Sequence, residues 1–145
     1  MKNTLKVLLV GAFGCMPLLG SKTIEKNKMQ LDDLAKDVLV YSKANLDPRN
    51  GHYPLMHRLM EWNHKASSMC GQDKQELMPE AEKVVTQIFD VILAHKPTYR
   101  QAADAADALA DMYCPLVKWD SEECKNMQEK FDKACDKIWQ DRKNK

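Results

Sequence analysis

The chain is 145 residues long, 44% of its residues are hydrophobic, and its formal net charge is +1. This length suffices for one domain with a hydrophobic core of its own. The charges are spread along the chain without a basic block, so nothing in the composition predicts a surface for nucleic acid or for an anionic membrane.

Residues 1–20 have the pattern of a signal peptide. Lys2 and Lys6 provide a short basic region, and the apolar stretch that follows is too short to span a bilayer as a helix. Residues 12–15, with the letters AFGC, also resemble the lipobox of bacterial lipoproteins, which makes Cys15 a candidate lipidation site. We therefore expect export, either as a periplasmic or secreted protein cut near the end of this segment, or as a membrane-anchored lipoprotein.

The first two predicted helices follow a polar segment. Residues 21–28 are polar and predict a flexible tether. Apolar residues at helical spacing predict a helix over residues 29–46, and the turn-forming residues 47–51 end it. A second helix is predicted over residues 53–70, with Gly71 as its C-terminal stop. The predicted buried stripe of this second helix is Leu55, Leu59, Trp62, Ala66 and Met69.

The third and fourth predicted helices are the most apolar part of the chain. The third is expected to begin at Pro79, because proline suits the first position of a helix. Apolar residues cover more than half of its circumference, so we expect it to be the central element of the fold. Thr98 and Gln101 have the spacing of a capping box, which predicts the start of an alanine-rich fourth helix that ends at Cys114.

The fifth predicted helix closes the domain. Its cap is Asp120 or Ser121, and two cysteines share its apolar face with Phe131. No segment alternates like a β-strand over more than a few residues, and residues 142–145 are expected to fray. The predicted fold class is all-α, a compact bundle of about five helices over residues 29–141, held by two disulfides and preceded by the signal segment.

Four cysteines lie beyond the leader, and an even number suits two disulfides in an oxidising compartment. Cys124 and Cys135 are separated by eleven residues of one predicted helix, or about 16 Å, which is too far for a disulfide. The favoured pairing is Cys114–Cys124 with Cys70–Cys135, because a hairpin between the last two helices brings the first pair together. The alternative pairing, Cys70–Cys124 with Cys114–Cys135, requires a tilted crossing of the helices.

His57, Met60 and His64 lie on one side of the second predicted helix, opposite its apolar stripe. Imidazole and thioether ligands together suit copper. However, the two histidines are two helical turns, or about 10 Å, apart, and one metal ion is too small to bridge them. These residues are therefore weak metal candidates, a solvent-exposed face is the favoured interpretation, and no cofactor is predicted.

Asp104, Asp107 and Asp111 form an acidic ridge on the fourth predicted helix. A solvated face opposite the alanines explains the ridge without a ligand. The functional interpretation is a contact surface for a basic partner, because charges of one sign steer association. Calcium is not favoured, since a straight helix cannot wrap oxygen ligands around the ion.

Sequence signatures of catalysis are missing. The chain has no G-x-S-x-G, no H-E-x-x-H and no glycine-rich phosphate loop, and its cysteines are too widely spaced for a C-x-x-C redox pair. We therefore predict a non-enzymatic protein that binds another envelope or extracellular protein. The alternative is a carrier of a small hydrophobic ligand in a cavity between the second, third and fifth predicted helices. A helical haem or copper protein is the weaker alternative.

Overall fold

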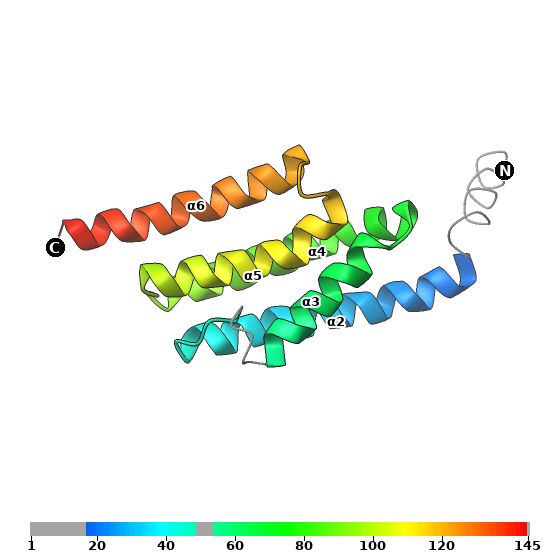
Figure 1. Cartoon of the computed structure of the whole chain (residues 1–145), viewed down its shortest axis with the longest axis horizontal. Coiled ribbons are helices and arrows are strands. Elements are labelled where there is room, and N and C mark those ends of the chain that lie inside the picture. The colour runs from blue at the N-terminus through cyan, green and yellow to red at the C-terminus, as the bar shows by residue number, and fades with distance from the viewer. Residues whose placement is uncertain (1–16, 49–53, 145) are drawn as a thin grey trace.

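Residues 17–48 and 54–144 are described by the computed structural model of the chain (Figure 1). Within these ranges the backbone forms five α-helices and no strand, which confirms the predicted all-α fold class. None of these helices is both long and apolar enough to cross a membrane. In chain order they are α2 (Pro17–Lys43), α3 (Pro54–Ser67), α4 (Gly71–Ala94), α5 (Tyr99–Val117) and α6 (Glu122–Lys143).

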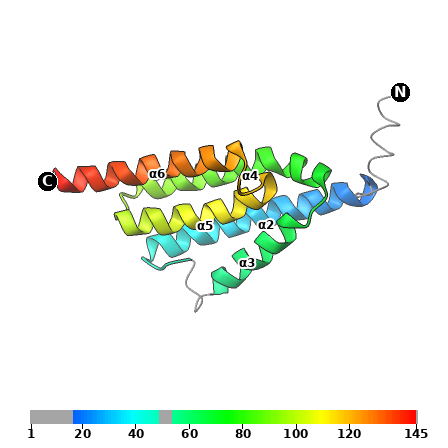
Figure 2. The same ribbon diagram turned by 45° about the horizontal axis from the view of Figure 1, so that its top comes forward.

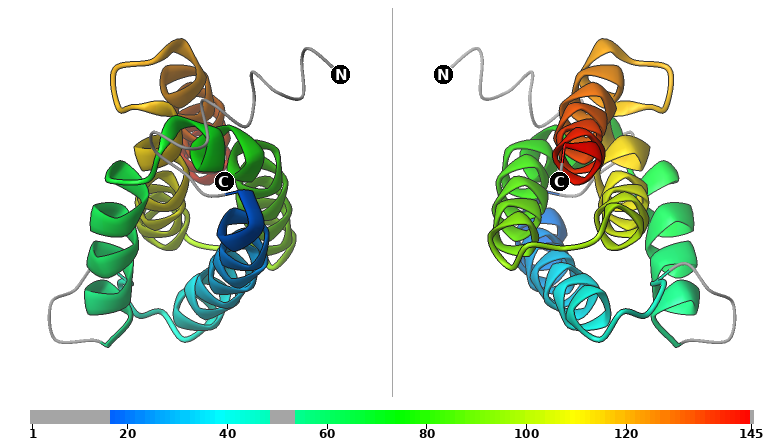
Figure 3. Two further views of the ribbon diagram at one scale, coloured as in Figure 1. Left: turned by 90° about the vertical axis from the view of Figure 1, so that its right-hand side faces the viewer. Right: turned by 90° about the vertical axis from the view of Figure 1, so that its left-hand side faces the viewer.

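The alanine-rich helix α5 is the element that the other four share. It packs against α2, α3, α4 and α6, and it is buried along most of its length. Seen along the bundle, α6 lies over α4 and α5, and α2 lies on the far side (Figure 3). Small side chains let neighbouring helices approach closely on several sides. The buried alanines of α5 are Ala102, Ala105, Ala106, Ala108 and Ala110.

The centre of the bundle therefore differs from the prediction. The apolar pattern places α4 at the centre, and α4 does pack against α2 on one side and α5 on the other. It also reaches α6 through Phe89 and Phe131, whose ring centroids are 4.4 Å apart. However, α5 contacts all four other helices, because its small residues leave room for a neighbour on every side.

Helix α3 is fastened to the bundle by a buried tryptophan and an ion pair. Trp62 is fully buried, and its Nε1 donates a hydrogen bond of 2.9 Å to the Met112 carbonyl oxygen of α5. On the other side, Arg58 pairs with Asp37 of α2. Four of the five predicted stripe residues of this helix are buried, and Met69, beyond the end of α3, is half-buried.

Two helices are longer than the sequence pattern predicts. Helix α2 begins at Pro17 and includes residues 21–28, where a tether is expected, because Ile24 and Asn27 pack into the bundle with 7% and 1% exposure. The apolar part of the predicted leader, including Cys15, lies outside the described residues. At the other end of the chain, α6 extends through Lys143 into the segment that is expected to fray.

Helix α4 also starts earlier than expected. It begins at Gly71, which is therefore not the C-terminal stop of α3, and Pro79 lies inside the helix. The physical reason is the apolar stripe, which continues through Leu77, a fully buried residue one turn before Ala81. Burial of this turn offsets the backbone hydrogen bond that proline cannot donate.

One of the two predicted disulfides is present within the described residues. Cys114 and Cys124 are bonded, with Cα atoms 5.1 Å apart, and they join the end of α5 to the start of α6. The predicted Cys70–Cys135 bond is wrong, since Cys135 is a free, buried thiol. Helices α4 and α6 run in the same direction (Figure 2). Cys70 directly precedes α4, at the end of the bundle where α4 and α6 both begin. Cys135 lies thirteen residues after the first residue of α6, or about 20 Å along the helix axis.

The buried side-chain amide of Asn27 lowers the stability of the core. Both Nδ2 and Oδ1 of Asn27 are buried without a hydrogen-bond partner. Leucine has nearly the same shape as asparagine and no polar atoms. Asn27→Leu should therefore raise the free energy of unfolding by about 1–3 kcal/mol, measured by urea denaturation with circular dichroism. Asn27→Asp is the opposing control and should lower it. A less stable leucine variant would contradict the unpaired state of this amide.

The turn after α5 holds a strained backbone. Lys118 has a φ of 74° and a ψ of 138°, a conformation that side chains disfavour and glycine adopts freely. Lys118→Gly should stabilise the protein by about 1 kcal/mol in the same denaturation experiment. Lys118→Ala keeps the side-chain clash and should give no such gain. Equal stability of the two variants would show that the turn relaxes without cost.

Candidate functional site

A groove between α5 and α6 brings acidic side chains from both helices together. It has a volume of about 240 Å³ and is open to solvent. The alanines of α5 leave this space, because they fill little of the gap opposite α6. We call it the acidic groove. Its lining residues are Ala106, Asp107, Ala110, Gln128, Phe131 and Asp132.

The predicted acidic ridge is divided by the tertiary structure. Asp107 is exposed and lines the acidic groove, and Asp111 follows one turn later, half-buried. Asp104 is half-buried and is paired with Arg100, whose Nε lies 3.3 Å from its Oδ2. Only Asp107 of the three predicted residues therefore lines the groove.

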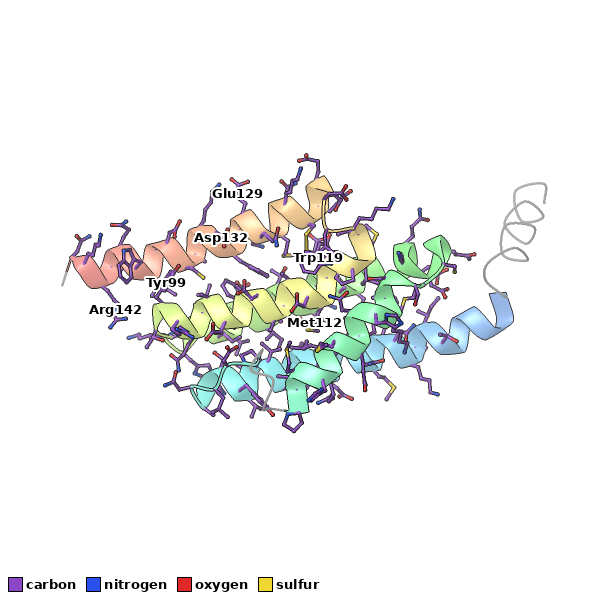
Figure 4. All side chains as sticks on the ribbon, in the orientation of Figure 1. Tyr99, Met112, Trp119, Glu129, Asp132 and Arg142 are labelled. Carbon is purple, nitrogen blue, oxygen red and sulfur yellow. A yellow bond between two sulfur atoms is a disulfide. The ribbon has the colours of Figure 1, made fainter. Side chains whose placement is uncertain are left out.

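Helix α6 supplies the acidic residues that sequence reasoning did not single out. Asp132 lines the groove, is exposed and is labelled in Figure 4, and Asp136 follows one turn later. Their spacing of four residues puts both on one face of α6. The hairpin through the Cys114–Cys124 disulfide then puts that face opposite α5. The spacing of Asp132 and Asp136 was visible in the sequence. That Asp107 of α5 lines the same groove as Asp132 was not.

The carboxylates of the groove disfavour each other's charge. Burial raises the pKa of Asp132 above its usual value, and the charges of Asp136 and Asp107 raise it further. The pKa of Asp104 is raised for similar reasons, by burial and by the charge of Asp47, while Arg100 opposes the shift. A cation in the groove would relieve this repulsion, so its field favours a positively charged ligand.

Cys135 lies on the buried face of α6 near the same carboxylates. Burial raises the pKa of its thiol to about 11, with further contributions from Asp132, Asp136 and Asp107. Only a very small fraction of this thiol is ionised at neutral pH, and the thiolate is the reactive form. The groove therefore lacks the activated nucleophile that thiol chemistry requires.

The short loop between α5 and α6 presents a tryptophan. Residues 118–121 join α5 to α6 inside the ring closed by the Cys114–Cys124 disulfide, and Trp119 is 44% exposed. The Ser121 hydroxyl donates to the Lys118 carbonyl oxygen at 2.7 Å and accepts from the backbone N–H of Cys124 at 3.2 Å. These bonds fix the loop, which carries Trp119 at the bundle surface (Figure 4).

The weak metal candidates lie away from this groove. His57, Met60 and His64 are exposed on α3, with Met60 at 57% exposure. Over residues 17–48 and 54–144, no group of three or more histidine, cysteine, aspartate or glutamate side chains is placed to hold a metal ion.

Comparison of the chain with protein-family models, with curated protein sequences and with solved structures finds no match. The function of the acidic groove must therefore be inferred from its own chemistry.

The burial of Asp132 and its repulsion by nearby carboxylates should measurably lower the stability of the fold. Because folding raises the pKa of Asp132, its ionised form costs stability at neutral pH, and this cost is relieved as the pH falls through the raised pKa towards the unfolded value. Asp132→Asn should raise the melting temperature at neutral pH by on the order of 1 °C, and the difference from wild type should shrink below about pH 4.

Glu129 provides the matched control for this measurement. It lies one turn before Asp132 on α6 (Figure 4). Its Oε1 pairs with Lys133 Nζ at 3.0 Å. Glu129→Gln removes the same charge outside the groove and should not raise the melting temperature. An equal rise in both variants would attribute the effect to net charge and not to the groove.

Proposed function

We propose that this protein is a non-enzymatic interaction protein of the cell envelope or extracellular space that binds a basic segment of another protein in the acidic groove. The observation that carries the proposal is that one groove combines buried apolar residues with exposed carboxylates from two helices. Ala106, Ala110 and Phe131 are buried lining residues, and Asp107 of α5 and Asp132 of α6 are exposed lining residues.

This arrangement is complementary to a lysine or arginine side chain. The aliphatic stem of such a side chain packs on apolar surface while its charged end stays with polar groups. In the groove the stem would contact the alanines of α5 and Phe131, and the charged end would lie between Asp107 and Asp132. A hydrogen bond between two charged groups is about twice as strong as one between neutral groups.

Trp119 is another exposed residue of the hairpin formed by α5 and α6. It lies in the loop before α6, and Asp132 lies ten residues after the first residue of α6, or about 15 Å along the helix axis. Tryptophan is enriched among the residues that contribute most to protein–protein binding. We therefore place an apolar contact of the partner on Trp119 and its basic residue in the acidic groove.

The proposed location outside the cytoplasm is supported by the Cys114–Cys124 disulfide. Disulfides persist in oxidising compartments and are rare in the cytosol of most cells. The periplasm or the extracellular space is therefore the proposed site of action, with anchoring through a lipid on Cys15 as the alternative. The residues that would carry the export signal lie outside the described ranges.

The proposal is tested by titrating isotope-labelled protein with a lysine-rich peptide and with a glutamate-rich peptide of equal length. The lysine peptide should shift the amide resonances of residues 106–110 and 128–132, and the glutamate peptide should not. The double variant Asp107→Asn/Asp132→Asn should bind the lysine peptide at least about 10-fold more weakly, since it loses two charge-assisted contacts.

The control variant Glu61→Gln/Glu129→Gln has the same net charge as the groove variant. Both of its positions are exposed and neither lines the groove. It should retain the affinity of the wild type. An equal loss of binding in both variants, or resonance shifts spread over the whole surface, would reduce the interaction to nonspecific charge attraction and would overturn the proposal.

A further inference from the structure

A second pocket lies at the other end of α6 from the Trp119 loop. It has a volume of about 500 Å³ and is formed where α4 ends, α5 begins and α6 ends. This volume is within the range of small-molecule sites, about 300–1,000 Å³. We call it the helix-end pocket. Its lining residues are Leu93, Lys96, Pro97, Thr98, Ile138, Asp141 and Arg142.

The wall of the helix-end pocket has an apolar part and a cationic part. Leu93, Pro97 and Ile138 are half-buried and provide the apolar surface. Lys96 and Arg142 are exposed cations, and among the described residues neither forms an ion pair. The charge of this end is therefore opposite to that of the acidic groove.

Two aromatic rings lie beside the pocket. Tyr99 at the start of α5 meets Trp139 of α6 edge to face, with ring centroids 5.6 Å apart. Trp139 is 45% exposed, and Lys143 Nζ lies 5.6 Å from its ring centroid. In Figure 4 the labels of Tyr99 and Arg142 lie together at this end of the bundle. Each of the two aromatic residues follows a lining residue in the sequence, Tyr99 after Thr98 and Trp139 after Ile138.

Two features of the backbone contribute to the pocket, the turn at Lys96 and the start of α5. Lys96 occupies the left-handed turn after α4, with a φ of 53°, and its N–H donates to the Leu93 carbonyl oxygen at 3.1 Å. Thr98 and Gln101 form the capping box of α5, so the positive end of that helix dipole lies at the pocket. Among the charged side chains of the lining, Lys96 and Arg142 are opposed by one carboxylate, Asp141, so these side chains sum to a charge of +1.

We propose that the helix-end pocket binds an amphipathic carboxylate, of the chemical class of a medium-chain fatty acid. The carboxylate pairs with Lys96 and Arg142, and the aliphatic chain lies along Leu93, Pro97 and Ile138 towards the aromatic rings. This activity goes beyond protein binding in the acidic groove and uses no residue of it. It also places a hydrophobic ligand at the helix ends, away from the cavity between helices that the sequence pattern suggests.

The test uses dodecanoate below its micellar concentration, with dodecanol and dodecylammonium as neutral and cationic probes of the same chain length. Trp139 reports binding by fluorescence in a Trp119→Phe background, because Trp62 is fully buried. Dodecanoate should bind saturably and shift the amide resonances of residues 93–98 and 138–142. The neutral and cationic probes should bind at least about 10-fold more weakly.

Variants separate the pocket from general charge effects. Lys96→Gln/Arg142→Gln should weaken dodecanoate binding at least about 10-fold, and Asp141→Asn should strengthen it. Arg100→Gln is the matched control, since Arg100 is an exposed cation at the same end whose side chain pairs with Asp104. The groove variant Asp107→Asn/Asp132→Asn should also bind dodecanoate normally, so the two proposals fail independently.

Three results would overturn the fatty-acid site. They are equal affinity for dodecanol and dodecanoate, resonance shifts away from the helix-end pocket, and a loss of binding in Arg100→Gln as large as in the double variant. The side chains of residues 96, 100, 141 and 142 are exposed, so we expect their variants to have the melting temperature of the wild type. An unchanged melting temperature shows that the variant is folded in the binding experiment.

Discussion

The close packing of α5 against its four neighbours is the constraint on which the rest of the structure depends. Its alanines let helices approach on several sides, and the larger side chains of the neighbours then fill the spaces between them. The Trp62 side chain of α3 donates a hydrogen bond to a carbonyl oxygen of α5, and Phe131 of α6 contacts Phe89 of α4. Substituting a large residue for a buried alanine of α5 would disturb several of these contacts at once.

The Cys114–Cys124 disulfide adds a second constraint at one end of this arrangement. It closes a short loop, fixes where α6 begins, and so determines which face of α6 is turned to α5. The same small alanines that allow tight packing leave the acidic groove open between Asp107 and Asp132. Structure and proposed function are thus linked, since the groove exists only where α5 has side chains too small to fill it.

The two proposed sites differ in charge because they draw on different parts of the helices. The acidic groove takes its charge from the middle of α5 and α6, and the helix-end pocket takes its charge from Lys96 and Arg142 at helix ends. Basic residues are favoured at helix C-termini by the helix dipole, and Lys96 and Arg142 lie at or just beyond the ends of α4 and α6. A chain with a net charge of only +1 therefore presents two surface regions whose charged side chains are of opposite net sign.

The sequence by itself determined the features that depend on near neighbours in the chain. The capping box of Thr98 and Gln101, the Ser121 cap, the buried face of α3 and the Cys114–Cys124 bond are all present, because each is set within about ten residues. Only the tertiary structure decided that residues 21–28 are helical, that Pro79 lies inside α4 and that Cys135 stays free. It also decided which acidic residues face each other and where three helix ends enclose a pocket. These features depend on how each helix is rotated about its axis and on the angle at which two helices cross. All side chains in a helix contact determine that geometry together, so a local sequence pattern does not specify it.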